Sequence, residues 1–163
     1  MPRSEAPHPR KKTNHGVPQV ILERAGFLLN KAAQRIREAT EAALRSFGLT
    51  GRHLGVLTVI HEKGVLPQLE IGRCIHVDRT TMVQIVDDLE KLGLVERKAN
   101  PSDRRAHALF LTAKGREVLP KAMRLGLDVE RKFLSCLSEK DQRDLARILK
   151  HLVLTHYAPS KKK

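Results

Sequence analysis

Four polar side chains follow Asp78 in a short part of the sequence and could contact a nucleic acid. They are Arg79, Thr80, Thr81 and Gln84. Hydroxyl, amide and guanidinium groups near the start of a helix can hydrogen-bond base edges and phosphate oxygens. A solvated helix face has the same composition. These four residues alone therefore leave both readings open.

A basic group lies around the segment 100–105. It consists of Arg97, Lys98, Arg104 and Arg105. The segment is too short to have a core of its own, so its cations can meet phosphates or enter a minor groove. Together with the four residues after Asp78, these side chains are the predicted DNA contacts.

The charge of the chain agrees with a polyanionic partner. It carries 31 Lys and Arg against 18 Asp and Glu, a formal net charge of +13. Such a charge favours nucleic acid or an anionic membrane surface. Residues 1–17 and 159–163 are predicted to be a disordered basic arm and a basic tail, since the arm has almost no apolar residues to bury. Residues 18–158 are long enough for one domain.

Apolar residues recur every three or four positions and predict the helices that would position these groups. One long helix is expected over 18–48, and its wide apolar stripe favours a dimer interface. Shorter helices are expected over 50–64, 67–75 and 78–93. Two short helices joined by a tight turn at residues 76–77 form a helix-turn-helix pattern, in which the second helix reads DNA.

After Gly93 the apolar period changes to that of a β-hairpin with its tip at 100–105. A hairpin directly after a helix-turn-helix is a wing. Helices follow from Thr112, with a kink expected at Pro120, and from Ser138. The predicted fold is mainly α with a small β-wing, in which a winged helix-turn-helix over 50–112 is flanked by dimerisation helices over 18–48 and 113–158.

Three runs of residues carry a family resemblance, and the match covers roughly residues 50–120. They are Gly93-Leu94-Val95-Glu96-Arg97, Asn100-Pro101-Ser102-Asp103-Arg104-Arg105 and Leu109-Phe110-Leu111-Thr112-Ala113-Lys114-Gly115. Their order and spacing resemble the wing signature of the MarR family (multiple antibiotic resistance regulators). The resemblance implies a homodimeric transcriptional regulator whose first and last helices interlock, with one winged module on each half of a pseudo-palindromic operator in double-stranded DNA.

The resemblance also implies roles for single residues. Arg105 would enter the minor groove, Asp103 would orient it through a charge-assisted hydrogen bond, and Arg97 would lie near a phosphate at the base of the wing. Asp103 thus joins the predicted DNA contacts. Most members of the family are repressors released by a small, often phenolic or otherwise anionic, effector bound between the reading module and the dimerisation helices.

Five residues near the module are candidate effector contacts, namely Phe27, Asn30, Lys31, His53 and Leu57. Each also has an ordinary structural reading. Phe27 and Leu57 suit a hydrophobic core, and His53 suits a partly buried position with hydrogen-bond partners.

The sequence lacks the motifs that would indicate other classes of protein. There is no Gly-rich phosphate loop, nucleophile elbow or Cys/His metal quartet, so no enzyme, cofactor or metal site is expected. Cys74 and Cys136 are expected to be buried, reduced thiols. No signal peptide or membrane span is recognised, which favours the cytoplasm. One alternative remains open, a sequence-neutral architectural DNA-binding protein. A winged-helix module that binds proteins is a third possibility, but an acidic or apolar wing would suit it better than four basic side chains.

Overall fold

A computed structural model describes residues 16–100 and 103–156, without the side chains of residues 100 and 103–107. The predicted tail over 159–163 and nearly all of the predicted basic arm lie outside these residues. The chain forms two units, Met1–Arg35 and Ile36–Lys163. Among the described residues, no helix combines the length and the apolar composition needed to cross a bilayer.

The first unit contains helix α1 (Gln19–Leu22) and the start of α2 (Ala25–Leu44), which continues into the second unit. The prediction of a single helix over 18–48 is therefore wrong. The Arg24 N–H donates to the Ile21 carbonyl, so the last turn tightens and α1 ends. Helix α1 buries none of its residues, so no packing supports a continuous helix. After α2, a 3₁₀ turn (Arg45–Phe47) leads to Gly48, whose φ of 67° ends the helical segment.

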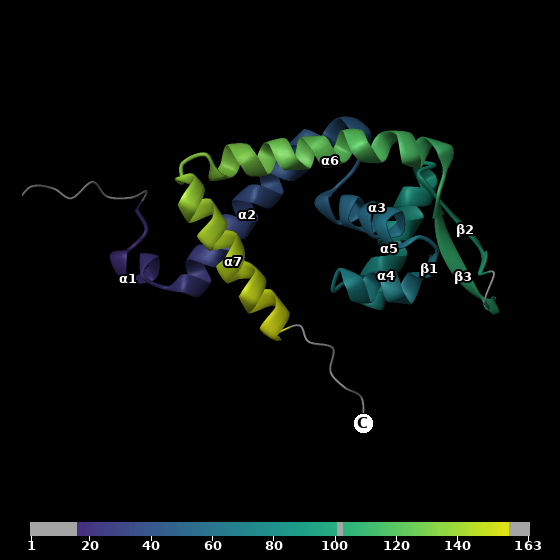
Figure 1. The fold of residues 1–163 in the computed structure, drawn as a ribbon, viewed down its shortest axis with the longest axis horizontal. Coiled ribbons are helices and arrows are strands. Elements are labelled where there is room, and N and C mark those ends of the chain that lie inside the picture. Colours follow the sequence, from purple (N-terminus) through teal and green to yellow (C-terminus); the bar gives the residue numbers. More distant parts are fainter. Residues whose placement is uncertain (1–15, 101–102, 157–163) are drawn as a thin grey trace, which may run out of the picture. The chain divides into compact units, whose positions relative to one another are not determined.

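In the second unit, α4 (Gln68–Cys74) and α5 (Arg79–Lys91) form the helix-turn-helix, which confirms the prediction, and α3 (Gly51–Lys63) precedes them. Figure 1 shows these helices gathered beside the hairpin. Between α4 and α5, His76 has a φ of 53°, a left-handed conformation that turns the chain sharply. The three helices meet in a core to which they contribute Val56, Leu57, Ile60, Ile71, Met82, Ile85, Val86 and Leu89.

The predicted hairpin is formed by β2 (Val95–Asn100) and β3 (Asp103–Leu111), which pair antiparallel. The strands reach further into the expected tip than the sequence indicated. A short strand β1 (Leu66–Pro67) adds to the other edge of β3, giving the order β1-β3-β2. Sequence analysis missed β1 because a strand of two residues has no periodicity and its partner is distant in the chain.

Two helices complete the second unit, α6 (Ala113–Leu134) and α7 (Glu139–His156). The Thr112 hydroxyl accepts a hydrogen bond from Gly115 N–H at 2.9 Å and caps α6, as predicted. Helix α6 continues through Pro120. Helix α7 buries none of its residues.

Both cysteines are exposed, so the prediction of buried thiols is wrong. Helix α4 buries Ile71 and Gly72, and Cys74 lies at its end, outside that buried face. Cys136 lies in the turn after α6, where its Sγ approaches the Phe133 carbonyl oxygen at 3.8 Å. Cys74 was predicted on the apolar side of its helix, and Cys136 near the end of a helix that ends at Leu134.

Candidate nucleic-acid interface

Helix α5 starts at Asp78, which caps it as predicted. The Asp78 carboxylate accepts hydrogen bonds from the Thr81 N–H at 2.9 Å and from the Thr81 hydroxyl at 2.6 Å. These bonds hold the pKa of the Asp78 carboxyl below its usual value, with the hydroxyl as the largest cause. Thr81 therefore stabilises the start of the helix, whereas Arg79 and Thr80 are exposed beside it.

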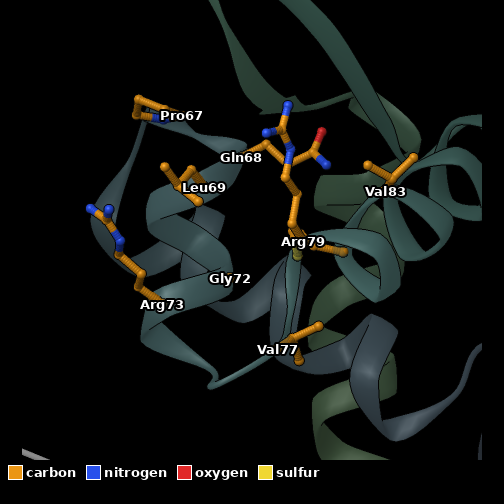
Figure 2. A pocket seen from close by; sticks show the side chains of 9 residues that line it. Pro67, Gln68, Leu69, Gly72, Arg73, Val77, Arg79 and Val83 are labelled. Carbon is orange, nitrogen blue, oxygen red and sulfur yellow. The ribbon is translucent and has the colours of Figure 1, made fainter. Parts of the chain in front are cut away.

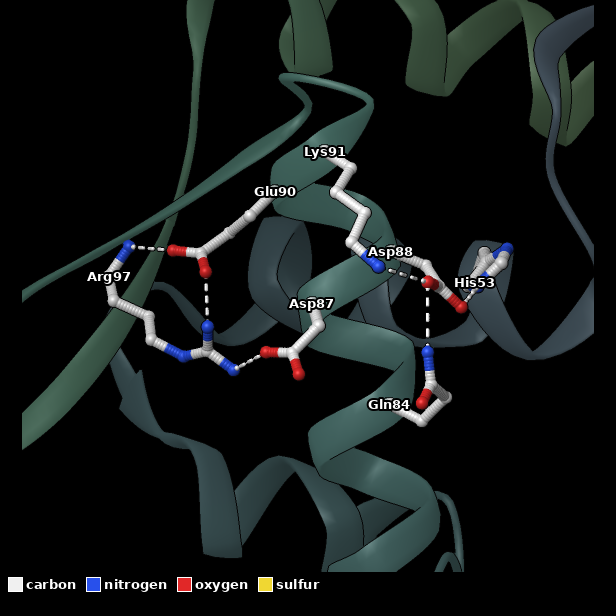
Figure 3. A network of polar contacts seen from close by, with 7 residues as sticks. All are labelled: His53, Gln84, Asp87, Asp88, Glu90, Lys91 and Arg97. Atoms are coloured by element: carbon white, nitrogen blue, oxygen red, sulfur yellow. Dashed lines mark hydrogen bonds and ion pairs between the residues drawn. The ribbon is translucent and has the colours of Figure 1, made fainter.

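Gln84 is exposed one turn further along α5, and its amide donates to Asp88 at 3.0 Å. Asp88 also meets Lys91 Nζ at 3.6 Å and His53 Nε2 at 3.9 Å. Figure 3 shows these side chains converging on Asp88. A base contact by Gln84 would thus be made by an amide whose orientation the protein already favours.

Helix α5 contributes to two hollows. One, with a volume of about 460 Å³, lies between α4 and α5, and Figure 2 shows Arg79 and Val83 among its walls. The other is an open cleft of about 900 Å³, to which α5 contributes Thr81, Gln84 and Asp88. The predicted contact residues of α5 are therefore divided between two cavities, with Arg79 at the first and Thr81 and Gln84 at the second.

Arg97 connects the wing to α5. Its backbone N–H donates to Glu90 Oε1 at 3.0 Å, and its guanidinium pairs with the other Glu90 oxygen and with Asp87 at 2.7 Å (Figure 3). The Arg97 side chain is only 27% exposed. Sequence analysis missed Asp87 and Glu90, although their spacing of three places them on one side of a helix.

The pairing of the hairpin places Arg97 and Lys98 on opposite faces. Arg97 pairs with Leu109 and Lys98 with Ala108, so neighbouring side chains alternate between the faces. Lys98 meets Glu96 at 2.6 Å and lies 5.6 Å from the centre of the Phe110 ring. The basic group predicted from the sequence is therefore divided, because Arg97 and Lys98 lie on opposite faces of the hairpin.

Of the expected wing tip, residues 100 and 103–105 are described by their backbone, and residues 101–102 lie outside the described part of the chain. Residues 103–105 belong to β3, but the side chains of Asp103, Arg104 and Arg105 lie outside the described part of the chain. The groove-entering role of Arg105 and the orienting role of Asp103 stay predictions.

The start and the end of the hairpin are joined by hydrogen bonds. Thr112 N–H donates to the Leu94 carbonyl at 3.1 Å, and the Thr112 hydroxyl donates to the Gly93 carbonyl at 2.6 Å. Lys114 Nζ donates to the Leu92 carbonyl at 2.8 Å. The Thr-Ala-Lys-Gly run that carried the family resemblance thus holds the base of the wing closed.

The five candidate effector residues are not brought together within one unit. Phe27, Asn30 and Lys31 belong to the first unit, where Lys31 Nζ lies 5.9 Å from the centre of the Phe27 ring. In the second unit, Leu57 is fully buried in the core, as the alternative interpretation of Leu57 as a core residue predicted. His53 lines the larger cleft, and sequence analysis missed further basic residues there, namely Arg37, Arg52 and His76.

His53 is buried at the start of α3, where it forms a capping box with Thr50. The Thr50 N–H donates to His53 Nδ1 at 3.0 Å, so the neutral ring carries its proton on Nε2. Burial lowers the pKa of His53 below its ordinary value of 6.5, and the Asp88 carboxylate offsets part of this shift. The folded chain therefore favours the neutral imidazole.

This lowered pKa predicts a loss of stability in mild acid. As the pH falls below 6.5, His53 in the unfolded chain takes up a proton more readily than in the folded chain, so the free energy of unfolding decreases. His53→Gln keeps a side chain suited to the capping box and cannot titrate. We expect urea unfolding at pH 7.5, 6.5 and 5.5 to show a smaller decrease for His53→Gln than for the unmodified protein. Equal decreases would contradict a neutral His53.

Comparisons with known proteins agree with this architecture. A model of the MarR family matches residues 47–106. An HTH-type transcriptional repressor of Mycobacterium bovis is 29% identical over 127 residues, covering 78% of this chain and 91% of that protein. The transcriptional repressor CouR, solved with a 23-mer DNA duplex, is 30% identical, with a TM-score of 0.77 over 82% of this chain and 94% of CouR.

Wild-type MarR from Escherichia coli, in its apo form, shares the fold. Its TM-score is 0.69 at 24% identity, and the match covers 80% of this chain and 97% of MarR. The mainly helical fold with a small antiparallel wing, the matching family model and these relatives agree. The chain belongs to the MarR family of winged helix-turn-helix transcriptional regulators.

Proposed function

We propose that the protein is a homodimeric repressor that binds a pseudo-palindromic operator sequence-specifically and is released by a small anionic or phenolic ligand. The observation that carries the proposal is the bridge from Arg97 to Asp87 and Glu90. It holds the wing against α5, so that two elements suited to DNA keep a fixed relation to each other. Preorganised contacts lose less entropy on binding.

The proposed DNA contacts divide between these two elements. From α5, Arg79, Thr80 and Gln84 would meet base edges and phosphates of the major groove, since all three are exposed. From the wing, Lys98 and Arg104 would meet phosphates, and Arg105, oriented by Asp103, would enter the minor groove. CouR, which is 30% identical to this chain, has been solved with a DNA duplex and supports this use of the fold.

Exposed apolar side chains support the homodimer. Helix α7 leaves Ile148, Leu152, Val153 and Leu154 between 41% and 64% exposed. Several large apolar residues on one helix are costly in a monomer and are typical of an interface. A two-fold dimer would present two copies of α5 to successive turns of DNA, as a pseudo-palindrome requires.

The 900 Å³ cleft beside α5 supports a small ligand. Its walls include Arg37 and Arg52, which suit an anionic group, and Thr81 and Gln84 of α5. A ligand in this cleft would therefore touch the helix proposed to read DNA. Among the structural neighbours, CouR from Rhodococcus jostii RHA1 has been solved with p-coumaroyl-CoA, and 6-hydroxynicotinic acid regulates DNA binding by BpsR of Bordetella bronchiseptica.

The test of this function starts from a duplex that the protein itself selects from a randomised library. The affinity of the protein for this selected duplex is compared with its affinity for a scrambled duplex of the same composition, at two salt concentrations. We expect about a thousandfold tighter binding of the selected duplex and, by sedimentation, two chains on each duplex. Equal affinities with a steep salt dependence would instead indicate a sequence-neutral architectural protein.

The same complex tests the release by a ligand. It is titrated with p-coumaroyl-CoA as a probe of a phenolic thioester and with 6-hydroxynicotinic acid as a probe of an aromatic acid. Release by either probe, weakened by Arg52→Ala in the cleft, supports the proposed effector site. Release that is unchanged in this variant would place the ligand elsewhere.

A further inference from the structure

Val83 is an exposed apolar residue on the face of α5 that the core does not use. Its neighbours along the helix, Met82, Ile85 and Val86, are buried, whereas Val83 is 41% exposed. The helical period places it with Thr80 and Gln84 on the outward side. An apolar side chain thus stands among the polar residues proposed to contact bases.

Folding offers no reason for a valine at this position. A β-branched residue at an exposed helix site loses side-chain freedom and is a weaker helix former than alanine. Val83 does not belong to the hydrophobic core or to the partly buried residues packed on it. Its exposed methyl groups are therefore available to a partner.

The surroundings of Val83 suit a nucleic acid. It forms one wall of the 460 Å³ hollow between α4 and α5, whose other walls include Gln68, Arg73 and Arg79. Figure 2 shows the Val83 side chain at the edge of this hollow, with the Arg79 side chain extending near its centre. Guanidinium groups can contact phosphates on either side of an apolar base contact.

In the major groove, the C5 methyl of thymine is the apolar group that base edges present. We propose that Val83 is a specificity-determining residue that packs against a thymine methyl, so that each operator half-site requires an A·T pair at that position. The proposal rests on the sequence-specific DNA binding proposed above. Val83 would thus recognise a thymine, in addition to the base contacts proposed for the polar residues of α5.

Replacing single thymines by deoxyuridine tests this contact, because the exchange removes the methyl group and leaves the Watson–Crick pair. Each thymine of the selected duplex is replaced in turn, and affinities are measured for the unmodified protein, Val83→Ala and Val65→Ala. Val65 is a matched control, since it is 43% exposed and lines a different hollow beside β3. Thermal unfolding checks that Val83→Ala folds as well as the unmodified protein does.

At one thymine of each half-site, we expect deoxyuridine to weaken binding by the unmodified protein and by Val65→Ala about fourfold. This corresponds to about 0.8 kcal/mol, at 1.4 kcal/mol per tenfold. Val83→Ala should bind the thymine duplex more weakly and show almost no further loss with deoxyuridine at that position, because the two changes remove the same contact.

Two results would overturn the inference. If every deoxyuridine exchange affects the unmodified protein and Val83→Ala equally, Val83 contacts no thymine methyl. If the unmodified protein does not distinguish the selected duplex from the scrambled one, the proposed function fails first. The scrambled duplex therefore separates the two failures.

Discussion

Gly115→Ala is expected to lower the free energy of unfolding by about 3 kcal/mol. A Cβ at this position would overlap the Leu94 carbonyl oxygen and lie 3.0 Å from its carbonyl carbon. Both atoms are backbone, at the point where the wing begins, and they cannot move without opening the hydrogen bond from Thr112 N–H to Leu94. Urea unfolding at pH 7.5 measures the change.

Gly126→Ala is the matched control on the same helix. A Cβ there would lie 3.3 Å from a terminal methyl of Leu54, which can rotate away. Alanine is also a better helix former than glycine by about 1 kcal/mol. The control should therefore be neutral or stabilising. A Gly115→Ala protein as stable as Gly126→Ala would show that the base of the wing tolerates rearrangement.

Arg97→Ala is expected to weaken binding of the selected duplex about tenfold to a hundredfold. The substitution leaves Asp87 and Glu90 without their cation, on a side of α5 next to the wing. The uncompensated carboxylates would repel phosphates, and the wing would lose its side-chain anchor. Because all three side chains are partly exposed, we expect the loss of folding stability to be only about 1 kcal/mol.

A triple variant distinguishes this mechanism from the phosphate contact that the family resemblance implied for Arg97. Adding Asp87→Asn and Glu90→Gln to Arg97→Ala removes the repelling charges and should restore part of the lost affinity. A direct phosphate contact would not be restored in this way, and its loss would reduce the slope of log affinity against log salt by about one unit. Measuring affinity at several salt concentrations gives both the recovery of affinity in the triple variant and the change in the salt slope.

Much of the candidate site was predictable because its signals are local. Asp78 caps α5, and the apolar spacing of Met82, Ile85 and Leu89 determines the outward face, so the exposure of Arg79 and Gln84 follows from the sequence alone. Val83 was the exception on this face. The helical period places it outward, but its apolar side chain gave no chemical signal, and its position in the wall of the hollow between α4 and α5 became known only from the structure.

Local patterns in the sequence therefore determined the kinds and order of the elements: caps, helical periods and the alternation of a hairpin depend on residues a few positions apart. The tertiary structure decided which elements meet. It paired Arg97 with Asp87 and Glu90, added β1 to β3, and placed the Leu94 carbonyl where Gly115 has no side chain. These contacts join segments whose separation and facing surfaces no local pattern contains, because they are set by how the shared core packs.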